Sequence, residues 1–282
     1  MAEAQHHAVI RNILVLWVMF AVFLGLSRFL PPFGSSALRS AATGCFLLCG
    51  TWVLMRVFAR RLDRTSSPGA WGFSNEGGSI LYFAAGLTLG FAMIALQIAN
   101  ISTFGDVTIV RNADLPSGMI ALTIASYLAW AAVEELGFRS YPLFRLNDAF
   151  GFWRAQLIVA LVFALYHIAG GVPLVPALLG TTVGSVAFGA AALASRGLAL
   201  PIGLHASWNI GEWLLGSKND RLSSPWQLDI AASSTQSVEV AGAIGYFVLY
   251  GAVIATCLWR IRKRRPLQSS ASNRAESADS AA

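Results

Sequence analysis

Two adjacent glutamates, Glu134 and Glu135, end a stretch that carries no charge from residue 118 to residue 133. A carboxylate inside a bilayer is costly, so such groups usually have a partner or a function. Successive helical side chains point about 100° apart, so the two acids cannot face one pocket in the same way. Arg139 follows Glu135 by four residues, which suits an ion pair. We therefore expect Glu135 to pair with Arg139 and Glu134 to face a cavity, although a purely structural pair would fit the same pattern.

Two histidines in apolar segments supply further polar groups. Phe163 and His167 are four residues apart and share a helix face, so the ring can fix the histidine rotamer. His205 and Asn209 also share a face, and their side chains can donate hydrogen bonds to one oxygen. With a glutamate that takes a proton from water, these are the parts of a hydrolytic site. A lone histidine would more often bond a carbonyl across helices, but several such groups in one chain favour a site.

Two other chemistries are open at these positions. Glu134, His167 and His205 would supply three zinc ligands and leave one position open, although the sequence has no His-Glu-x-x-His motif. Buried glutamate and histidine also build proton relays in transporters, but no two halves of the chain are related as inverted repeats.

Nucleophilic catalysis by serine fits less well. Ser207 lies on a different helix face from His205 and Asn209, and the chain has no Gly-x-Ser-x-Gly elbow. A stripe of small residues further along is interpreted as a helix-packing face: Gly180, Gly184, Ser185 and Gly189.

The composition places the chain in a membrane. Of 282 residues, 56% are hydrophobic and only 12% are charged, whereas soluble domains carry about 25% charged residues. The net charge of +6 does not indicate nucleic acid as a partner, because the basic residues cluster at the ends of apolar runs. Three cysteines in apolar segments are expected to be small buried thiols rather than metal ligands or a disulfide framework: Cys45, Cys49 and Cys257.

The elements that must position these residues are transmembrane helices. Runs of about 17 to 25 apolar residues can cross a bilayer. Eight such runs occur, at 10–30, 38–58, 80–99, from 118 onward, 153–168, 174–194, 198–215 and 240–259. The first is too long for a signal-peptide core and is expected to be retained. We predict an all-α polytopic membrane protein with about eight transmembrane helices within residues 1–265.

The basic residues predict the orientation. With eight spans, 15 of the 20 lysines and arginines fall on the side of both termini. The positive-inside rule then places both termini in the cytoplasm and the loops at 100–117 and 216–237 outside. Residues 266–282 are rich in serine and alanine and are expected to form a disordered cytoplasmic tail.

Three motifs stand in order: Glu134-Glu135-x-x-x-Arg139, Phe163-x-x-x-His167 and His205-x-x-x-Asn209. Over residues 118–215 the chain resembles the CPBP family of CAAX proteases and bacteriocin-processing enzymes, also called the abortive-infection or type II CAAX prenyl endopeptidase family. The resemblance implies a glutamate-dependent intramembrane protease of mostly eight helices.

By this resemblance, Glu134 and His167 would activate water, and His205 and Asn209 would form the oxyanion hole. Glu135 and Arg139, with Phe163, would hold the motif helices in place. The partners would be membrane lipid and a protein or peptide substrate, lipidated in the eukaryotic members, with no cofactor, metal or nucleic acid. The location would be the inner (cytoplasmic) membrane. The alternatives are a non-catalytic membrane partner or bacteriocin-immunity protein on the same fold, or a zinc-dependent hydrolase.

The simple topology raises one conflict. It places Glu134 near the cytoplasmic end of the fourth run and His167 near the outer end of the fifth, whereas one site needs both at one depth. We expect the fourth helix to continue past Arg139 until Pro142 ends it, or the fifth helix to be tilted.

Overall fold

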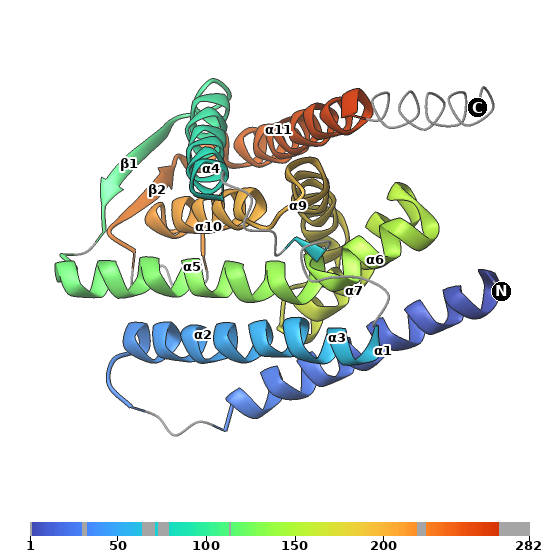
Figure 1. Ribbon diagram of the computed structural model, residues 1–282. Helices are drawn as coiled ribbons and strands as arrows, with labels where there is room; N and C mark the ends of the chain where they lie inside the picture. Colours follow the sequence, from blue (N-terminus) through green and yellow to red (C-terminus); the bar gives the residue numbers. More distant parts are fainter. Residues whose placement is uncertain are drawn as a thin grey trace.

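The computed structural model describes residues 2–29, 33–63, 71–72, 79–112, 114–218 and 224–264. Long helices dominate it (Figure 1): Ala2–Ser27 (α1), Ser36–Val53 (α2), Ser79–Ser102 (α4), Ser117–Arg139 (α5), Phe152–Ala169 (α7), Thr182–Ser195 (α9), Ala199–Leu214 (α10) and Thr235–Arg264 (α11). α2 is extended by a π-helical turn, Leu54–Phe58, and then by α3, Ala59–Leu62. α6 is Tyr141–Phe150, and α8, Leu174–Pro176, leads through a second π-helical turn, Ala177–Thr181, into α9.

Seven helical segments within the described ranges are long and apolar enough to cross a membrane. The remaining predicted run, 198–215, forms α10, which has 16 residues. Exposed leucine, isoleucine, valine and phenylalanine side chains cover the outer faces of α1, α4, α7 and α11, as lipid contact requires. The prediction of an all-α polytopic membrane protein is confirmed. The predicted tail at 266–282 lies outside the described residues.

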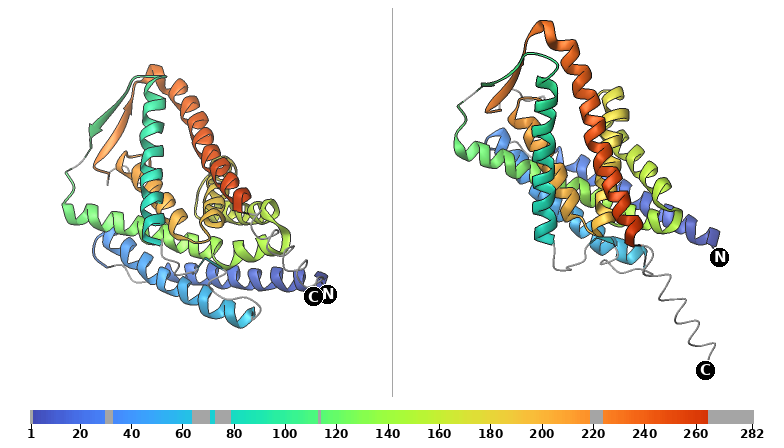
Figure 2. Two further views of the ribbon diagram at one scale, coloured as in Figure 1. Left: turned by 45° about the horizontal axis from the view of Figure 1, so that its top comes forward. Right: turned by 90° about the horizontal axis from the view of Figure 1, so that it is seen from above.

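Two short strands were not predicted. Val107–Arg111 (β1) and Trp226–Ile230 (β2) pair antiparallel, with Val107 opposite Ile230 and Arg111 opposite Trp226. The strands come from the two loops predicted to face outward, and each satisfies the backbone hydrogen bonds of the other. They lie next to the end at which α4 and α11 meet (Figure 2). The 3-10 turn Ala232–Ser234 connects β2 to α11.

The short helix α10 lies inside the protein, between α4, α5 and α9 (Figure 1). None of its residues is exposed. Backbone contact makes this close packing possible: a Cβ on Gly86 of α4 would lie 2.3 Å from the carbonyl oxygen of Leu200, and one on Gly203 would lie 2.4 Å from that of Phe83. Small residues that let membrane helices approach closely have this effect. The polar residues of α10 are therefore shielded from lipid by neighbouring helices.

The depth conflict is resolved by α6. α5 ends at Ser140, whose backbone conformation is not helical. Pro142 lies in the first turn of α6 rather than at the end of a longer helix, since proline fits a first helical turn. The chain reverses at Gly151, which has a φ of 79°. Gly151 is nearly midway in the chain between Glu134 and His167, and α7 packs back along α6. Glu134 and His167 are thereby brought to the wall of one cavity.

The cysteine prediction was correct only for Cys257. Cys45 and Cys49 are exposed on the surface of α2. The buried side of this helix is formed by Ala41, Gly44, Leu47 and Thr51, and both cysteines lie between these positions on the outer side. Gly44 packs against Ala129 of α5, where an added Cβ would lie 2.9 Å from that methyl group.

The contact between α4 and α10 predicts a matched pair of substitutions. Gly86→Ala places a methyl group against the backbone of α10, whereas Gly251→Ala in α11 meets nothing within 4 Å. Overpacking costs roughly 1–3 kcal/mol. We expect Gly86→Ala to lower the melting temperature of the purified protein in detergent and Gly251→Ala to leave it unchanged or raise it. Equal melting temperatures for the two variants would contradict the close α4–α10 contact.

Candidate active site

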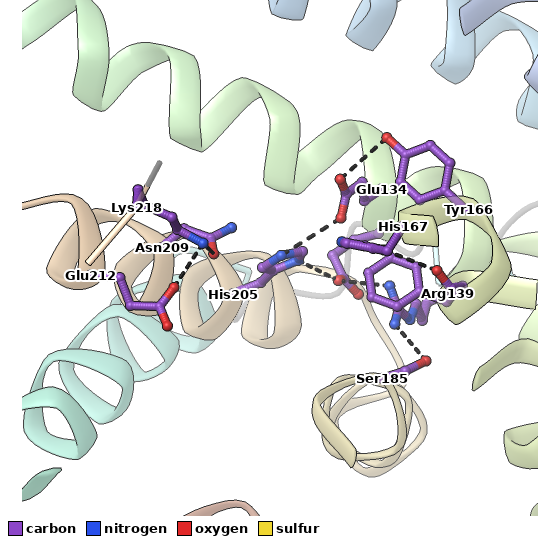
Figure 3. A network of polar contacts seen from close by, with 11 residues as sticks. Glu134, Arg139, Tyr166, His167, Ser185, His205, Asn209, Glu212 and Lys218 are labelled. Carbon is purple, nitrogen blue, oxygen red and sulfur yellow. Dashed lines mark hydrogen bonds and ion pairs between the residues drawn. The ribbon is translucent and has the colours of Figure 1, made fainter. Parts of the chain in front are cut away.

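Four of the predicted site residues line one cavity. Its volume is about 400 Å³, and Glu134 of α5, His167 of α7, and His205 and Asn209 of α10 all contribute to its wall. In Figure 3, Glu134 and His205 point toward each other from α5 and α10, with His167 beside them. Further polar groups in the lining come mainly from α2 and α5: Ser36, Ser40, Thr123, Ser126, Tyr127, Trp130 and Lys218.

Glu134 is the acid that faces the cavity. Its side chain is 13% exposed. Its Oε1 accepts a hydrogen bond of 3.4 Å from the Tyr166 hydroxyl, and its Oε2 lies 3.7 Å from Nε2 of His205. Each carboxylate oxygen thus keeps lone pairs that a cavity water can reach.

Glu135 points into the protein instead. Its Oε1 accepts a hydrogen bond of 3.1 Å from Nη1 of Arg139, and neither side chain is exposed. Arg139 also donates to the Ser185 hydroxyl at 2.8 Å, and its guanidinium lies 4.0 Å from the centre of the Phe163 ring. The expected ion pair is present, and Ser185, interpreted as part of a packing face, instead supports the arginine. The small-residue interpretation holds for Gly189, where an added Cβ would lie 2.2 Å from the Gln156 side chain, whereas a Cβ added at Gly180 would meet nothing within 4 Å.

His205 lies between the two acids. Its Nδ1 is 2.9 Å from Oε1 of Glu135, and its Nε2 faces Glu134. An ionised carboxylate can only accept, so Nδ1 carries a hydrogen. The ring of Phe188 stacks on the imidazole at 4.5 Å and 15°. Glu135 therefore sets the orientation of His205 as well as pairing with Arg139.

His167 is fixed within its own helix. Its Nδ1 lies 2.9 Å from the carbonyl oxygen of Phe163, and the two rings are 4.4 Å apart. Because a carbonyl only accepts, Nδ1 carries the hydrogen, and in the neutral ring Nε2 is left as an acceptor. The pattern of Phe163 and His167 thus fixes the tautomer through the backbone and the rotamer through the ring.

Asn209 has a partner that the sequence analysis did not single out. Nζ of Lys218 donates to Oδ1 of Asn209 at 3.0 Å and lies 2.7 Å from Oε2 of Glu212 (Figure 3). Lys218 was counted among the residues of an outer loop. The sequence analysis also missed the contacts made by Tyr166, Ser185 and Phe188. Their partners are distant in sequence, and only helix packing brings them together.

Ser207 takes no part in this arrangement. Its hydroxyl donates to the carbonyl oxygen of Gly203 at 2.8 Å and lies where a Cβ on Gly90 of α4 would be. It belongs to the α4–α10 contact, on the other side of α10 from the cavity. Within the part of the chain that the structure describes, no three histidine, cysteine, aspartate or glutamate side chains are grouped closely enough to hold a metal ion.

A family model matches part of the chain. It is described as Type II CAAX prenyl endopeptidase Rce1-like, and the match covers residues 116–211, from just before α5 into α10. No curated protein matches the chain. The match includes all three sequence motifs and ends before Glu212 and Lys218. The resemblance drawn from the sequence is confirmed at the level of this match: residues 116–211 of this multi-pass membrane protein are similar to the type II CAAX prenyl endopeptidase Rce1-like domain.

Proposed function

We propose that the protein is an intramembrane endopeptidase that hydrolyses a peptide bond with a glutamate-activated water. The observation that carries this proposal is the cavity of about 400 Å³ shared by Glu134, His167, His205 and Asn209. A hydrated cavity surrounded by apolar helices supplies the water that hydrolysis needs, and it strengthens electrostatic interactions with the reacting groups.

Glu134 and His167 act on the attacking water. The Glu134 carboxylate accepts one proton as the water oxygen forms a bond to the carbonyl carbon, and Nε2 of His167 accepts a hydrogen bond from the other. Tyr166 holds Glu134 by its hydroxyl. Glu134 then gives its proton to the amide nitrogen, the C–N bond breaks, and an acid and an amine leave without a covalent intermediate.

His205 and Asn209 act on the carbonyl oxygen. Both donors lie one turn apart on α10, so they can converge on the charge that develops there. Nδ1 of His205 is held by Glu135, so Nε2 donates only when the ring is an imidazolium. Glu135 therefore orients this donor as well as pairing with Arg139.

The substrate we propose is a membrane-associated protein or peptide, lipidated as the family description implies, with lipid as the other partner and no nucleic acid. No cofactor takes part in the proposed reaction. The proposed location is the inner membrane with both termini in the cytoplasm, which is supported by the distribution of basic residues.

The general-base role predicts the effect of Glu134→Gln. Proton transfer by a positioned group contributes about 100- to 10,000-fold, so turnover should fall by that factor while the folded yield stays the same. The assay uses protein in liposomes and a quenched peptide that ends in a prenylated cysteine and three further residues. Asp114→Asn, in an exposed loop pair with Arg111, is the control. A non-catalytic protein would show equal signals for Glu134→Gln and wild type, and a zinc hydrolase would lose turnover on chelation and regain it with zinc.

The oxyanion role predicts a different kinetic change for Asn209→Ala. Loss of one oxyanion donor costs about 100- to 1000-fold in turnover. We expect kcat to fall in that range with KM little changed, because the donor matters more in the transition state than in the ground state. A raised KM with normal kcat would show that Asn209 binds substrate or packs the helix.

The buried ion pair predicts a loss of stability. Arg139→Met leaves the Glu135 charge buried without its arginine, and breaking such a pair costs about 3–5 kcal/mol. Folded yield and melting temperature should fall together with activity. The double variant Arg139→Met, Glu135→Gln removes both charges, so it should regain folded yield but not activity, because His205 loses its carboxylate. A single variant as stable as wild type would rule out this view of the pair.

A further inference from the structure

Asn209 lies between two cavities. A second cavity of about 280 Å³ shares His167, His205, Asn209 and Lys218 with the first. A side-chain amide bordered by space on both sides is not held in one orientation by packing alone. Its two ends differ chemically, since one donates and the other accepts. Something other than packing must therefore decide which end meets the reacting carbonyl oxygen.

The chain brings Lys218 back to this amide by a specific turn. Nine residues of continuous helix would carry Lys218 far from Asn209. α10 instead ends at Leu214, and Gly216 adopts a φ of 68°, a left-handed conformation that favours glycine. Ser217 N–H donates to the carbonyl of Glu212 at 2.9 Å, which closes the helix end in the manner of a Schellman turn.

The segment after this turn is anchored by the sheet. The Leu228 N–H of β2 donates to the carbonyl of Leu215 at 3.1 Å. A Cβ on Gly216 would lie 3.1 Å from that of Gln227. The two strands thus hold the turn from which the Lys218 side chain reaches back to α10.

The contact between Lys218 and Asn209 allows only one orientation of the Asn209 amide. An ammonium group donates and cannot accept, so the amide atom 3.0 Å from Nζ is the oxygen. The amide nitrogen is then directed away from Lys218. Glu212, 2.7 Å from Nζ, balances the charge and holds the ammonium in place.

We propose that Lys218, held by Glu212, is a positioning residue that keeps the Asn209 amide nitrogen directed at the reacting carbonyl oxygen. This inference rests on the proposed function, and it adds two residues that lie beyond the matched domain. Without Lys218, the Asn209 amide can rotate by half a turn and present its oxygen to the developing negative charge. The donor is then available only part of the time, so the loss is smaller than that of Asn209→Ala.

The test is a set of variants in the liposome assay. Lys218→Met keeps the length of the side chain and removes its donors, and we expect kcat to fall roughly 10- to 100-fold, below the loss for a deleted oxyanion donor, with KM unchanged. Glu212→Gln should act in the same direction, and Lys218→Arg should restore most of the activity. Lys263→Met is the matched control, because Lys263 is the only other lysine and lies on the last turn of α11.

Combination with Asn209→Ala separates positioning from other roles. If Lys218 acts through Asn209, Lys218→Met should cause no further loss in the Asn209→Ala background. A raised KM in both backgrounds would show a substrate contact and overturn the proposal. A further drop in kcat in the Asn209→Ala background would show an independent role and overturn it as well.

A second measurement does not depend on turnover. In protein labelled with ¹⁵N-asparagine, the side-chain amide signal of Asn209 is identified by its loss in Asn209→Ala. Lys218→Met should shift or broaden that signal, and Lys263→Met should not. An unchanged signal overturns the positioning role. Absence of wild-type turnover with a signal that responds to Lys218→Met contradicts the proposed function but supports the contact.

Discussion

The buried pair of Glu135 and Arg139 is the interaction on which the rest of the site depends. Both side chains are fully enclosed, and either charge alone would be very costly there. Arg139 is contacted from three sides: by Glu135, by Ser185 of α9 and by the face of the Phe163 ring of α7. One guanidinium therefore joins α5, α7 and α9. Because Glu135 is committed to this centre, the adjacent Glu134 is directed to the cavity.

The same carboxylate also organises α10. Glu135 holds Nδ1 of His205, so the imidazole is fixed between an acid that faces the interior and an acid that faces the cavity. Phe188 stacks on one side of the ring and restricts its rotation. This arrangement separates a charge that stabilises the fold from one that is available for chemistry, although the two residues are neighbours in the chain.

Placing so many polar groups within a membrane requires protein on all sides of them. α10 achieves this because glycine contacts let α4 approach its backbone directly, and α5 and α9 cover the rest. The helix can be short because it does not itself need to contact lipid across the bilayer. A cavity can then exist beside His205 and Asn209 without exposing either residue to acyl chains.

The sequence alone determined the features that depend on local spacing. Apolar runs of transmembrane length located the helices, because only a helix satisfies every backbone group in lipid. Four-residue spacing identified the pairing of Glu135 with Arg139, the packing of Phe163 on His167, and the shared face of His205 and Asn209. These relations are set by the geometry of one helix, so no neighbour is needed to predict them.

The tertiary structure decided everything that joins residues from different helices. The contact of His205 with Glu135 and that of Tyr166 with Glu134 cross between helices, and helix spacing carries no information about them. The reversal at Gly151 brings His167 to the same cavity as Glu134. The return of Lys218 to Asn209 required a left-handed turn at Gly216 and two strands whose pairing no local pattern indicated. Local periodicity shows which face a residue occupies, but only packing decides what that face meets.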